Sequence, residues 1–159
     1  MTAEPAPATL APIVKRVEVR CSPDRAFEIF TASIGEWWPL ATHSVYEAEA
    51  ASVAMALRLG GEIVETSASG ETAPWGTITT WEPGRRLAFT WYPGLPLDEA
   101  TDVEVRFMPS AHGTLVELEH SGWERRREPA AKRANYDRGW DPVLAGFVAR
   151  ADSVADLQP

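Results

Sequence analysis

The sequence has a single cysteine, only three histidines and no long apolar run. One cysteine, Cys21, excludes an internal disulfide and a metal site made of several cysteines. No apolar stretch is long enough for a membrane-spanning helix, and the proline-rich start lacks the basic end of a secretion signal. We therefore expect a cytoplasmic protein that does not enter a membrane.

Positive charge is also scarce. Lysine and arginine number 15 against 23 acidic residues, which gives a net charge of −8. A general nucleic-acid binder needs a basic surface to displace counterions, so we expect no nucleic-acid partner. The one basic cluster, residues 124–133, alternates with acids and predicts a solvated loop that leads into a helix. No HExxH, CxxC or glycine-rich phosphate loop occurs, and we expect no metal and no cofactor.

Local patterns predict one strand and two short helices before residue 40. Residues 13–20 alternate apolar and charged side chains, which is typical of a strand with one wet face. Ser22 followed by Pro23 is a strong helix start, and Pro39 ends a second short helix. Cys21, beside this helix start, is either a half-buried small residue or a thiol of lowered pKa.

Six further segments alternate with a period of two, separated by glycine and proline turns. In the first of them Val53, Met55, Leu57 and Leu59 are expected on one face. Strands in such succession predict an antiparallel meander. The six segments are residues 52–61, 62–68, 75–84, 85–94, 101–110 and 114–123.

Helical spacing returns from about residue 129 to 152, and we expect a bend or short break near Gly139–Pro142. The predicted fold is α+β: a curved antiparallel sheet of six to seven strands around a long C-terminal helix, with two short helices after the first strand. The domain is predicted to span residues 12–153, between tails at 1–11 and 154–159. A sheet curved more widely than one helix leaves a gap, which predicts a pocket between the two.

Several motifs resemble one superfamily when they are taken in order. These are "VEVRCSPDRAFEIFTASIGEWWP", "GGEIVE", "WGTITTWEPGRRLAFTW", "TLVELEHSGW" and "RGWDPVLAGF". They resemble the START-like (SRPBCC) helix-grip superfamily and, within it, the branch named after the activator of the heat shock protein 90 ATPase. The resemblance covers about residues 13–152 and implies a helix-grip fold. Members include lipid carriers, hormone binders, polyketide cyclases and co-chaperone domains, and the chain resembles only the activator's C-terminal domain, so the fold alone does not give the function.

Aromatic and polar residues at inward positions are the candidates for ligand contact. Tryptophans pack well in a small core, but those facing the gap between sheet and helix would also suit a flat or fatty molecule. No catalytic residue is assigned. The candidate ligand-binding residues are Trp37, Trp38, His43, Glu65, Trp91, Phe107, His120, Tyr136 and Trp140.

Three of these candidates are ionisable, and each has two interpretations. His120 shares a strand face with inward residues and is either a satisfied core histidine or a ligand anchor and proton carrier. His43 follows the short helix and either borders the pocket entrance or lies on a surface loop. Glu65 is in phase with Ile63, so it is either buried with a partner or at a solvent-facing edge. The predicted partners of a buried Glu65 are Arg58, His43, Tyr136 or a tryptophan N–H.

The leading hypothesis for function is the binding of a hydrophobic or aromatic small molecule between the sheet and the last helix. One alternative is a cyclase- or hydratase-like enzyme that uses His120 or Glu65 to move protons. Another is a co-chaperone-type regulator of the heat shock protein 90 ATPase. An exposed edge strand would also allow two copies to pair as a homodimer.

Overall fold

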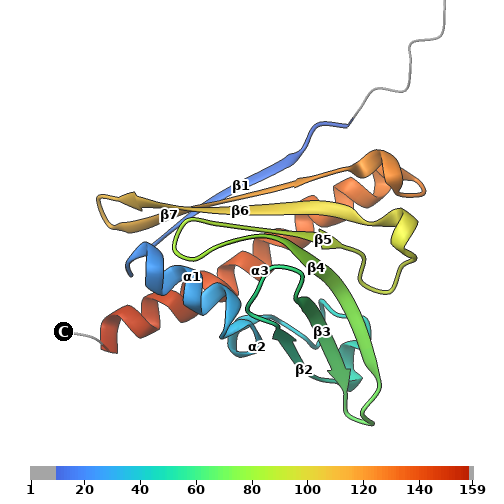
Figure 1. Cartoon of the computed structure of the whole chain (residues 1–159), viewed down its shortest axis with the longest axis horizontal. Helices are drawn as coiled ribbons and strands as arrows, with labels where there is room; N and C mark the ends of the chain where they lie inside the picture. The colour runs from blue at the N-terminus through green and yellow to red at the C-terminus, as the bar shows by residue number, and fades with distance from the viewer. Residues whose placement is uncertain (1–9, 158–159) are drawn as a thin grey trace, which may run out of the picture.

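The computed structural model describes residues 10–157 as one curved sheet wrapped around a long helix (Figure 1). The predicted N-terminal tail falls largely outside these residues. The helices are α1 (Pro23–Thr31), α2 (Ile34–Trp37) and α3 (Pro129–Leu157), with single 3-10 turns at Glu47–Glu49, Leu97–Glu99 and Trp123–Arg125. The strands are β1 (Ile13–Val19), β2 (Ala50–Met55), β3 (Glu62–Ser67), β4 (Thr72–Glu82), β5 (Arg86–Trp91), β6 (Thr101–Ser110) and β7 (Gly113–Ser121).

The seven strands lie in the order β1-β7-β6-β5-β4-β3-β2, and every neighbouring pair is antiparallel. The α+β helix-grip architecture predicted from the sequence is therefore confirmed. Register shifts interrupt the β2–β3, β3–β4 and β4–β5 pairings. Such bulges increase the local twist and bend of a sheet. Figure 1 shows the result, with β2, β3 and β4 turned away from the plane of β6 and β7.

The short helices start and end where the sequence indicates. Ser22 caps α1, because its Oγ accepts the backbone N–H of Arg25 at 3.2 Å. Trp38 ends α2 with ψ of 129°, the extended conformation that a residue before proline favours. The chain after Trp38 therefore leaves the helix as a loop, which runs to the 3-10 turn at Glu47–Glu49.

Helix α3 is one continuous element of 29 residues with Pro142 inside it, so the predicted break does not occur. It also continues beyond residue 153, where the sequence suggested a tail. Lys15 of β1 holds the helix by ion pairs of 3.0 Å to both Asp137 and Asp141. These contacts fix the N-terminal half of α3 against the edge of the sheet. No helix within residues 10–157 is long and apolar enough to cross a membrane.

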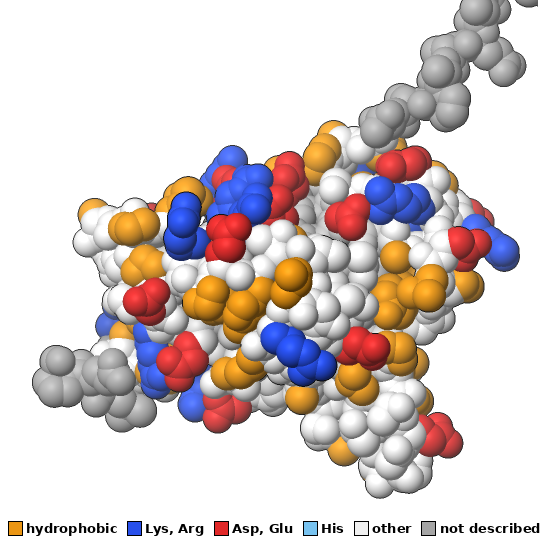
Figure 2. Space-filling view, viewed as in Figure 1, with side chains coloured by type: hydrophobic (Ala, Val, Ile, Leu, Met, Phe, Trp, Pro, Cys, Tyr) orange, Lys and Arg blue, Asp and Glu red, His pale blue; other side chains and the backbone are white. Residues whose placement is uncertain are grey.

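The outer face of the sheet is polar. Outward residues of β5, β6 and β7 form a chain of ion pairs, with Arg106 bonded to Glu104 at 3.1 Å and to Glu117 at 3.0 Å. Figure 2 shows acidic and basic side chains side by side over the sheet side of the molecule. Exposed pairs of this kind contribute little stability, and they make the outer surface of β5, β6 and β7 polar.

Three sequence predictions are wrong in detail. Leu57 and Leu59 do not share the buried face of Val53, because β2 ends at Met55 and the two leucines lie in the following turn, 50% and 66% exposed. Strand β4 begins at Thr72, inside the segment expected to be a turn. Cys21 is buried rather than half-buried, and burial raises the pKa of its thiol.

One end of the interior is solidly packed, and we call it the filled half. Here α1, α2 and the C-terminal part of α3 meet the sheet. Phe30 lies at its centre, with ring centroids 5.1 Å from Trp37, 5.2 Å from Phe147 and 6.0 Å from Phe107. Phe27 completes the group, 5.2 Å from Phe107. These spacings are typical of aromatic pairs in direct contact, so the rings of the filled half pack against one another.

Candidate ligand-binding site

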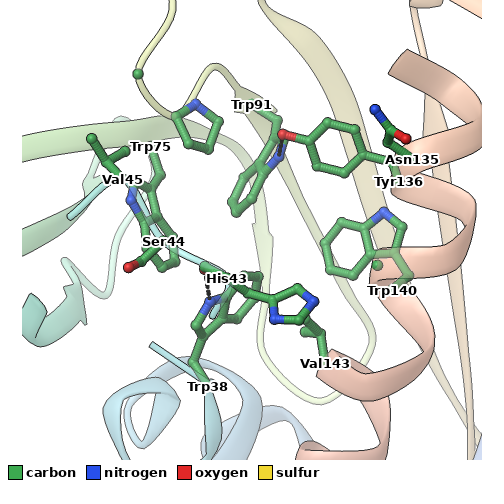
Figure 3. A pocket seen from close by; sticks show the side chains of 13 residues that line it. Trp38, His43, Ser44, Val45, Trp75, Trp91, Asn135, Tyr136, Trp140 and Val143 are labelled. Carbon is green, nitrogen blue, oxygen red and sulfur yellow. Dashed lines mark hydrogen bonds between the residues drawn. The ribbon is translucent and has the colours of Figure 1, made fainter. Parts of the chain in front are cut away.

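The other end of the interior contains a pocket of about 470 Å³, which we call the pocket half (Figure 3). It lies between the loop after α2, the ends of β4 and β5, and the N-terminal half of α3. The lining side chains are mostly aromatic or aliphatic. They are Trp38, His43, Ser44, Val45, Trp75, Trp91, Pro93, Gly94, Asn135, Tyr136, Gly139, Trp140 and Val143.

Four tryptophans form a continuous wall of this pocket. Trp38 is central, with its ring centroid 4.9 Å from Trp75, 5.7 Å from Trp91 and 6.0 Å from Trp140. Trp91 lies 5.5 Å from Trp75 and 5.9 Å from Trp140. The rings therefore support one another from behind while their free faces and edges border the cavity.

Each of these indoles also donates its N–H to a fixed acceptor. The Trp38 Nε1–H donates to the carbonyl oxygen of His43 at 2.6 Å, and the Trp75 Nε1–H donates to Glu65 at 2.8 Å. The Trp91 Nε1–H donates to the Tyr136 hydroxyl at 3.2 Å, and the Trp140 Nε1–H donates to Nδ1 of His120 at 3.0 Å. Because rotating a ring into the cavity would break its hydrogen bond, the wall is held open.

Glu65 of β3 anchors the loop that covers the pocket. Its side chain is fully buried, and its carboxylate accepts the backbone N–H of Val45 at 2.8 Å and of Tyr46 at 3.0 Å besides the Trp75 indole. The inward interpretation of Glu65 therefore holds, with a tryptophan N–H among its partners. It lies behind the wall and not in the lining, so its role is to position the loop.

His43 is the imidazole that borders the cavity. Its Nδ1 shares a 2.7 Å hydrogen bond with the Thr42 hydroxyl. Its other edge lies over Gly139 of α3, where an added Cβ would be 3.9 Å from Cδ2 and 4.0 Å from Nε2. The missing side chain at Gly139 thus makes room for this ring, and Figure 3 shows it between Trp38 and Trp140.

His120, in contrast, is a satisfied core histidine. It has no exposed surface, its Nδ1 accepts the Trp140 indole N–H at 3.0 Å, and its Nε2 is 2.7 Å from the Thr101 hydroxyl. An indole nitrogen only donates, so Nδ1 is unprotonated and Nε2 carries the proton. Burial, with a smaller contribution from the charge of Arg126, lowers the pKa of His120 from 6.5 to about 3. A neutral His120 therefore fixes Trp140 from behind.

Arg126 is the feature that sequence reasoning missed. It belongs to the basic cluster expected to be solvated, yet only 4% of it is exposed. Its guanidinium donates to three neutral oxygens and lies 5.4 Å above the centroid of the Tyr136 ring. The acceptors are the carbonyls of Glu99 at 2.7 Å and Trp91 at 2.9 Å, and the Thr101 hydroxyl at 3.3 Å. Nothing in the run "RRR" distinguishes the buried member from its neighbours.

The structure brings together some of the predicted residues and separates others. Trp37 and Phe107 belong to the filled half, while Glu65 and His120 support the wall from outside. The predicted residues that line the pocket are Trp38, His43, Trp91, Tyr136 and Trp140. Trp75 was missed because it and Gly76 are both buried, so strict alternation fails at this point of β4, next to a register shift against β3. Ligand contact by any of these residues remains a prediction.

The fold and the pocket together define a helix-grip protein with a small-molecule-sized cavity. The family profile described as activator of Hsp90 ATPase homolog 1-like protein matches residues 20–152, and the chain belongs to this family. No curated protein sequence matches the chain. Among residues 10–157, no group of three histidine, cysteine or acidic side chains is placed to hold a metal ion.

Several solved structures are similar over nearly their whole length. A protein from Rhodobacter sphaeroides is 17% identical, with a TM-score of 0.65 over 96% of this chain and 97% of its own. The Aha1 dimer from Colwellia psychrerythraea is 16% identical, with a TM-score of 0.66 over 90% and 97%. An anthrahydroquino-gamma-pyrone synthase, Txn09, solved in complex with SUM, is 30% identical, with a TM-score of 0.61 over 91% and 99%.

Proposed function

We propose that the protein binds a flat aromatic small molecule in the pocket half. The observation that carries this proposal is the wall of four tryptophans, whose free faces border a cavity of about 470 Å³. Small-molecule sites are typically apolar cavities of about 300–1,000 Å³ with a few polar groups. Planar rings stack on indole faces better than a flexible chain does, which favours an aromatic ligand over a fatty acid.

Fluorescence titration and thermal unfolding test this proposal. We expect anthraquinone and flavone to quench tryptophan emission and to raise the melting temperature, and a straight-chain fatty acid to do neither. Val45→Trp places a ring at the pocket mouth, where Val45 is 37% exposed, and should weaken binding at least about tenfold. Val14→Trp is the matched control, since Val14 is 42% exposed on β1 and outside the pocket. Unchanged emission and melting temperature with every aromatic probe would overturn the proposal.

A second candidate is a ring-forming enzyme that acts on an aromatic polyketide-like substrate. It is favoured by the 30% identity to the synthase Txn09, which covers 91% of this chain. Such an activity would use the same pocket. His120 and Glu65, the proton carriers suggested by sequence, lie behind the wall with their hydrogen bonds occupied, so this candidate needs polar groups inside the lining. Turnover of a hydroxylated polycyclic ketone, followed by mass spectrometry, would separate an enzyme from a binding protein.

Two predicted protein partners are supported by relatives alone. The family is named after an activator of the Hsp90 ATPase, and the relative from Colwellia psychrerythraea is a dimer. A co-chaperone role predicts a faster chaperone ATPase on addition of this protein, and a homodimer predicts twice the monomer mass in light scattering. The predicted cytoplasmic location can be tested by cell fractionation.

A further inference from the structure

The pocket half carries a buried positive charge behind its wall. The guanidinium of Arg126 bonds only neutral oxygens, and the described residues form no ion pair with it. The nearby carboxylate of Glu99 accepts the backbone N–H of Arg127 at 3.1 Å instead. A buried charge without a counter-charge is costly, and it favours negative charge on whatever enters the adjacent space.

Tyr136 connects this charge to the cavity. Its ring lies under the Arg126 guanidinium, and its hydroxyl oxygen accepts the Trp91 indole N–H at 3.2 Å. Within residues 10–157 no acceptor is bonded to the proton of this hydroxyl. Figure 3 shows the hydroxyl at the rim of the cavity, next to Trp91. A phenol that already accepts one hydrogen bond is a stronger donor, so Tyr136 offers its proton to an oxygen of the ligand.

His43, in the loop after α2, borders the same cavity. Its Nδ1 is occupied by Thr42, which leaves Nε2 as the nitrogen free for a ligand. The edge that carries Nε2 lies over Gly139, one turn after Tyr136 on the helix. Both residues line the pocket, but Figure 3 shows the Tyr136 hydroxyl directed toward Trp91 and the His43 ring beside Trp38 and Val143, so they border different parts of the cavity.

The other ionisable groups near the pocket are already bound to protein partners, so they do not offer a charge to the ligand. Glu65 lies behind Trp75 with its carboxylate held by three N–H donors, and His120 is neutral behind Trp140. Asp137, the neighbour of Tyr136 on α3, pairs with Lys15. The electrostatic asymmetry of the pocket is therefore set by Arg126 on the Tyr136 side.

We propose that the pocket selects a hydroxylated aromatic ketone or quinone and holds it as its anion. The ligand O–H bond breaks, its proton passes to the buffer, and the resulting oxyanion accepts the Tyr136 hydroxyl in the field of Arg126. No oxidant or other reactant is required. This inference rests on the proposed function and names the chemical class of its ligand, because a plain hydrocarbon would leave both the Tyr136 proton and the Arg126 charge unsatisfied.

The ionisation of a bound dye tests this proposal directly. The visible band of 2-hydroxyanthraquinone moves to longer wavelength when its hydroxyl ionises. We expect the bound dye to have a pKa lower by about one unit or more than the free dye. Tyr136→Phe should abolish this shift and weaken binding of the dye about tenfold. Anthracene, which has no oxygen, should lose less affinity than the dye, because it loses only the support that the Tyr136 hydroxyl gives to Trp91. Tyr46→Phe is the matched control, because Tyr46 does not line the pocket.

The two ways of failing are distinguishable. If neither the dye nor anthracene binds, the proposed function is wrong and the ligand class falls with it. If both bind, but the bound dye keeps its ordinary pKa or Tyr136→Phe retains the shift, the ligand class is wrong while the aromatic site stands.

Calorimetry tests the release of the proton. At a pH where the free dye is neutral, ionisation on binding passes the proton to the buffer, so the binding heat should differ between phosphate and Tris buffers. In Tyr136→Phe the dye should stay neutral, and the heat should then be the same in both buffers. A buffer-independent heat in the wild type would overturn the ionisation of the ligand.

Discussion

The filled half and the pocket half are both built from aromatic rings, yet only one of them is hollow. Around Phe30 the rings meet one another, and the buried Thr31 hydroxyl at the end of α1 donates to the backbone carbonyl of Phe27 at 2.8 Å. Around the pocket, three fully or nearly buried ionisable side chains stand behind the rings: Glu65, His120 and Arg126. The halves differ in the acceptors of their indoles: Trp37 in the filled half donates to the carbonyl oxygen of Ile29 at 2.8 Å, whereas Trp75 and Trp140 donate to the buried ionisable side chains of Glu65 and His120.

The largest effect is expected in the filled half. Phe30→Ala removes a ring that is 1% exposed and contacts three other aromatic side chains. Large-to-small changes of this kind cost about 3–5 kcal/mol, because a cavity is added to the lost transfer energy. Chemical denaturation measures the loss. Val45→Ala, at the pocket mouth, is expected to change stability by less than about 0.5 kcal/mol. Similar losses in the two variants would show that the halves are packed alike.

The second effect is a pH dependence that belongs to the pocket half. His120 is neutral when folded, with a pKa of about 3, whereas its ordinary value is 6.5. As pH falls below 6.5 the unfolded chain gains a proton that the folded chain does not, so stability falls by up to about 1.4 kcal/mol per pH unit until pH 3 is approached. In His120→Gln this contribution is absent.

Unfolding free energies of the wild type and of His120→Gln, measured from pH 7 to pH 4, test the sign. The variant should be less stable at pH 7, because Gln replaces only part of the hydrogen bonding of His120. The difference should narrow as the pH falls. His112→Gln, in the exposed turn between β6 and β7, is the control and should leave the wild-type slope unchanged. A constant difference across this range would mean that His120 titrates normally in the fold.

The third effect concerns the anchor of the loop. Glu65→Gln keeps the shape but places an amide N–H opposite one of the three N–H donors that the carboxylate accepts. Leaving a buried donor unpaired costs about 1–3 kcal/mol. We expect faster hydrogen exchange at the amides of Val45 and Tyr46, measured by NMR, together with this loss. Glu62→Gln, exposed on the same strand, should change neither quantity. Unaltered exchange in Glu65→Gln would show that the loop is held by other contacts.

The sequence predicts the filled half better than the pocket half, for a physical reason. The alternation along β5, β6 and β7 follows because one face of the sheet is buried. The start of α1 follows from a local hydrogen bond of Ser22, which precedes Pro23. Both signals act over a few residues. They are sufficient for the antiparallel succession of β2 to β7, but not for the pairing of β1 with β7 or for assigning Phe107 and Trp37 to the filled half.

The pocket half depends on contacts that are distant in sequence. Glu65 bonds a loop 20 residues earlier in the chain, and Arg126 bonds Trp91, 35 residues away. Periodicity gives the direction of a side chain but not the partner it meets, so a buried Glu65 was one of two interpretations, and the loop amides that it binds were not among its predicted partners. It likewise cannot tell that Arg126 is buried where Arg125 and Arg127 are exposed.

The smallest effect is expected at Gly139, one of two glycines on α3 that lie in different halves. In the filled half, an added Cβ at Gly146 would lie 2.6 Å from the carbonyl oxygen of Trp37. Gly146→Ala should therefore destabilise the protein by about 1–3 kcal/mol through overpacking, despite the better helix propensity of alanine. In the pocket half, an added Cβ at Gly139 meets only the His43 ring, at ordinary contact distances of 3.9 and 4.0 Å.

Gly139→Ala should therefore have the opposite sign. Alanine in a helix interior is favoured over glycine by about 0.5–1 kcal/mol, and nothing in the pocket half opposes the added methyl group. The same methyl narrows the cavity beside His43, so binding of a flat aromatic probe should weaken about threefold while the melting temperature of the free protein rises. Thermal unfolding and fluorescence titration of the two alanine variants measure both quantities. If Gly139→Ala destabilised the protein as Gly146→Ala does, the space beside His43 would be closed, and the distinction between the two halves would be lost at this helix.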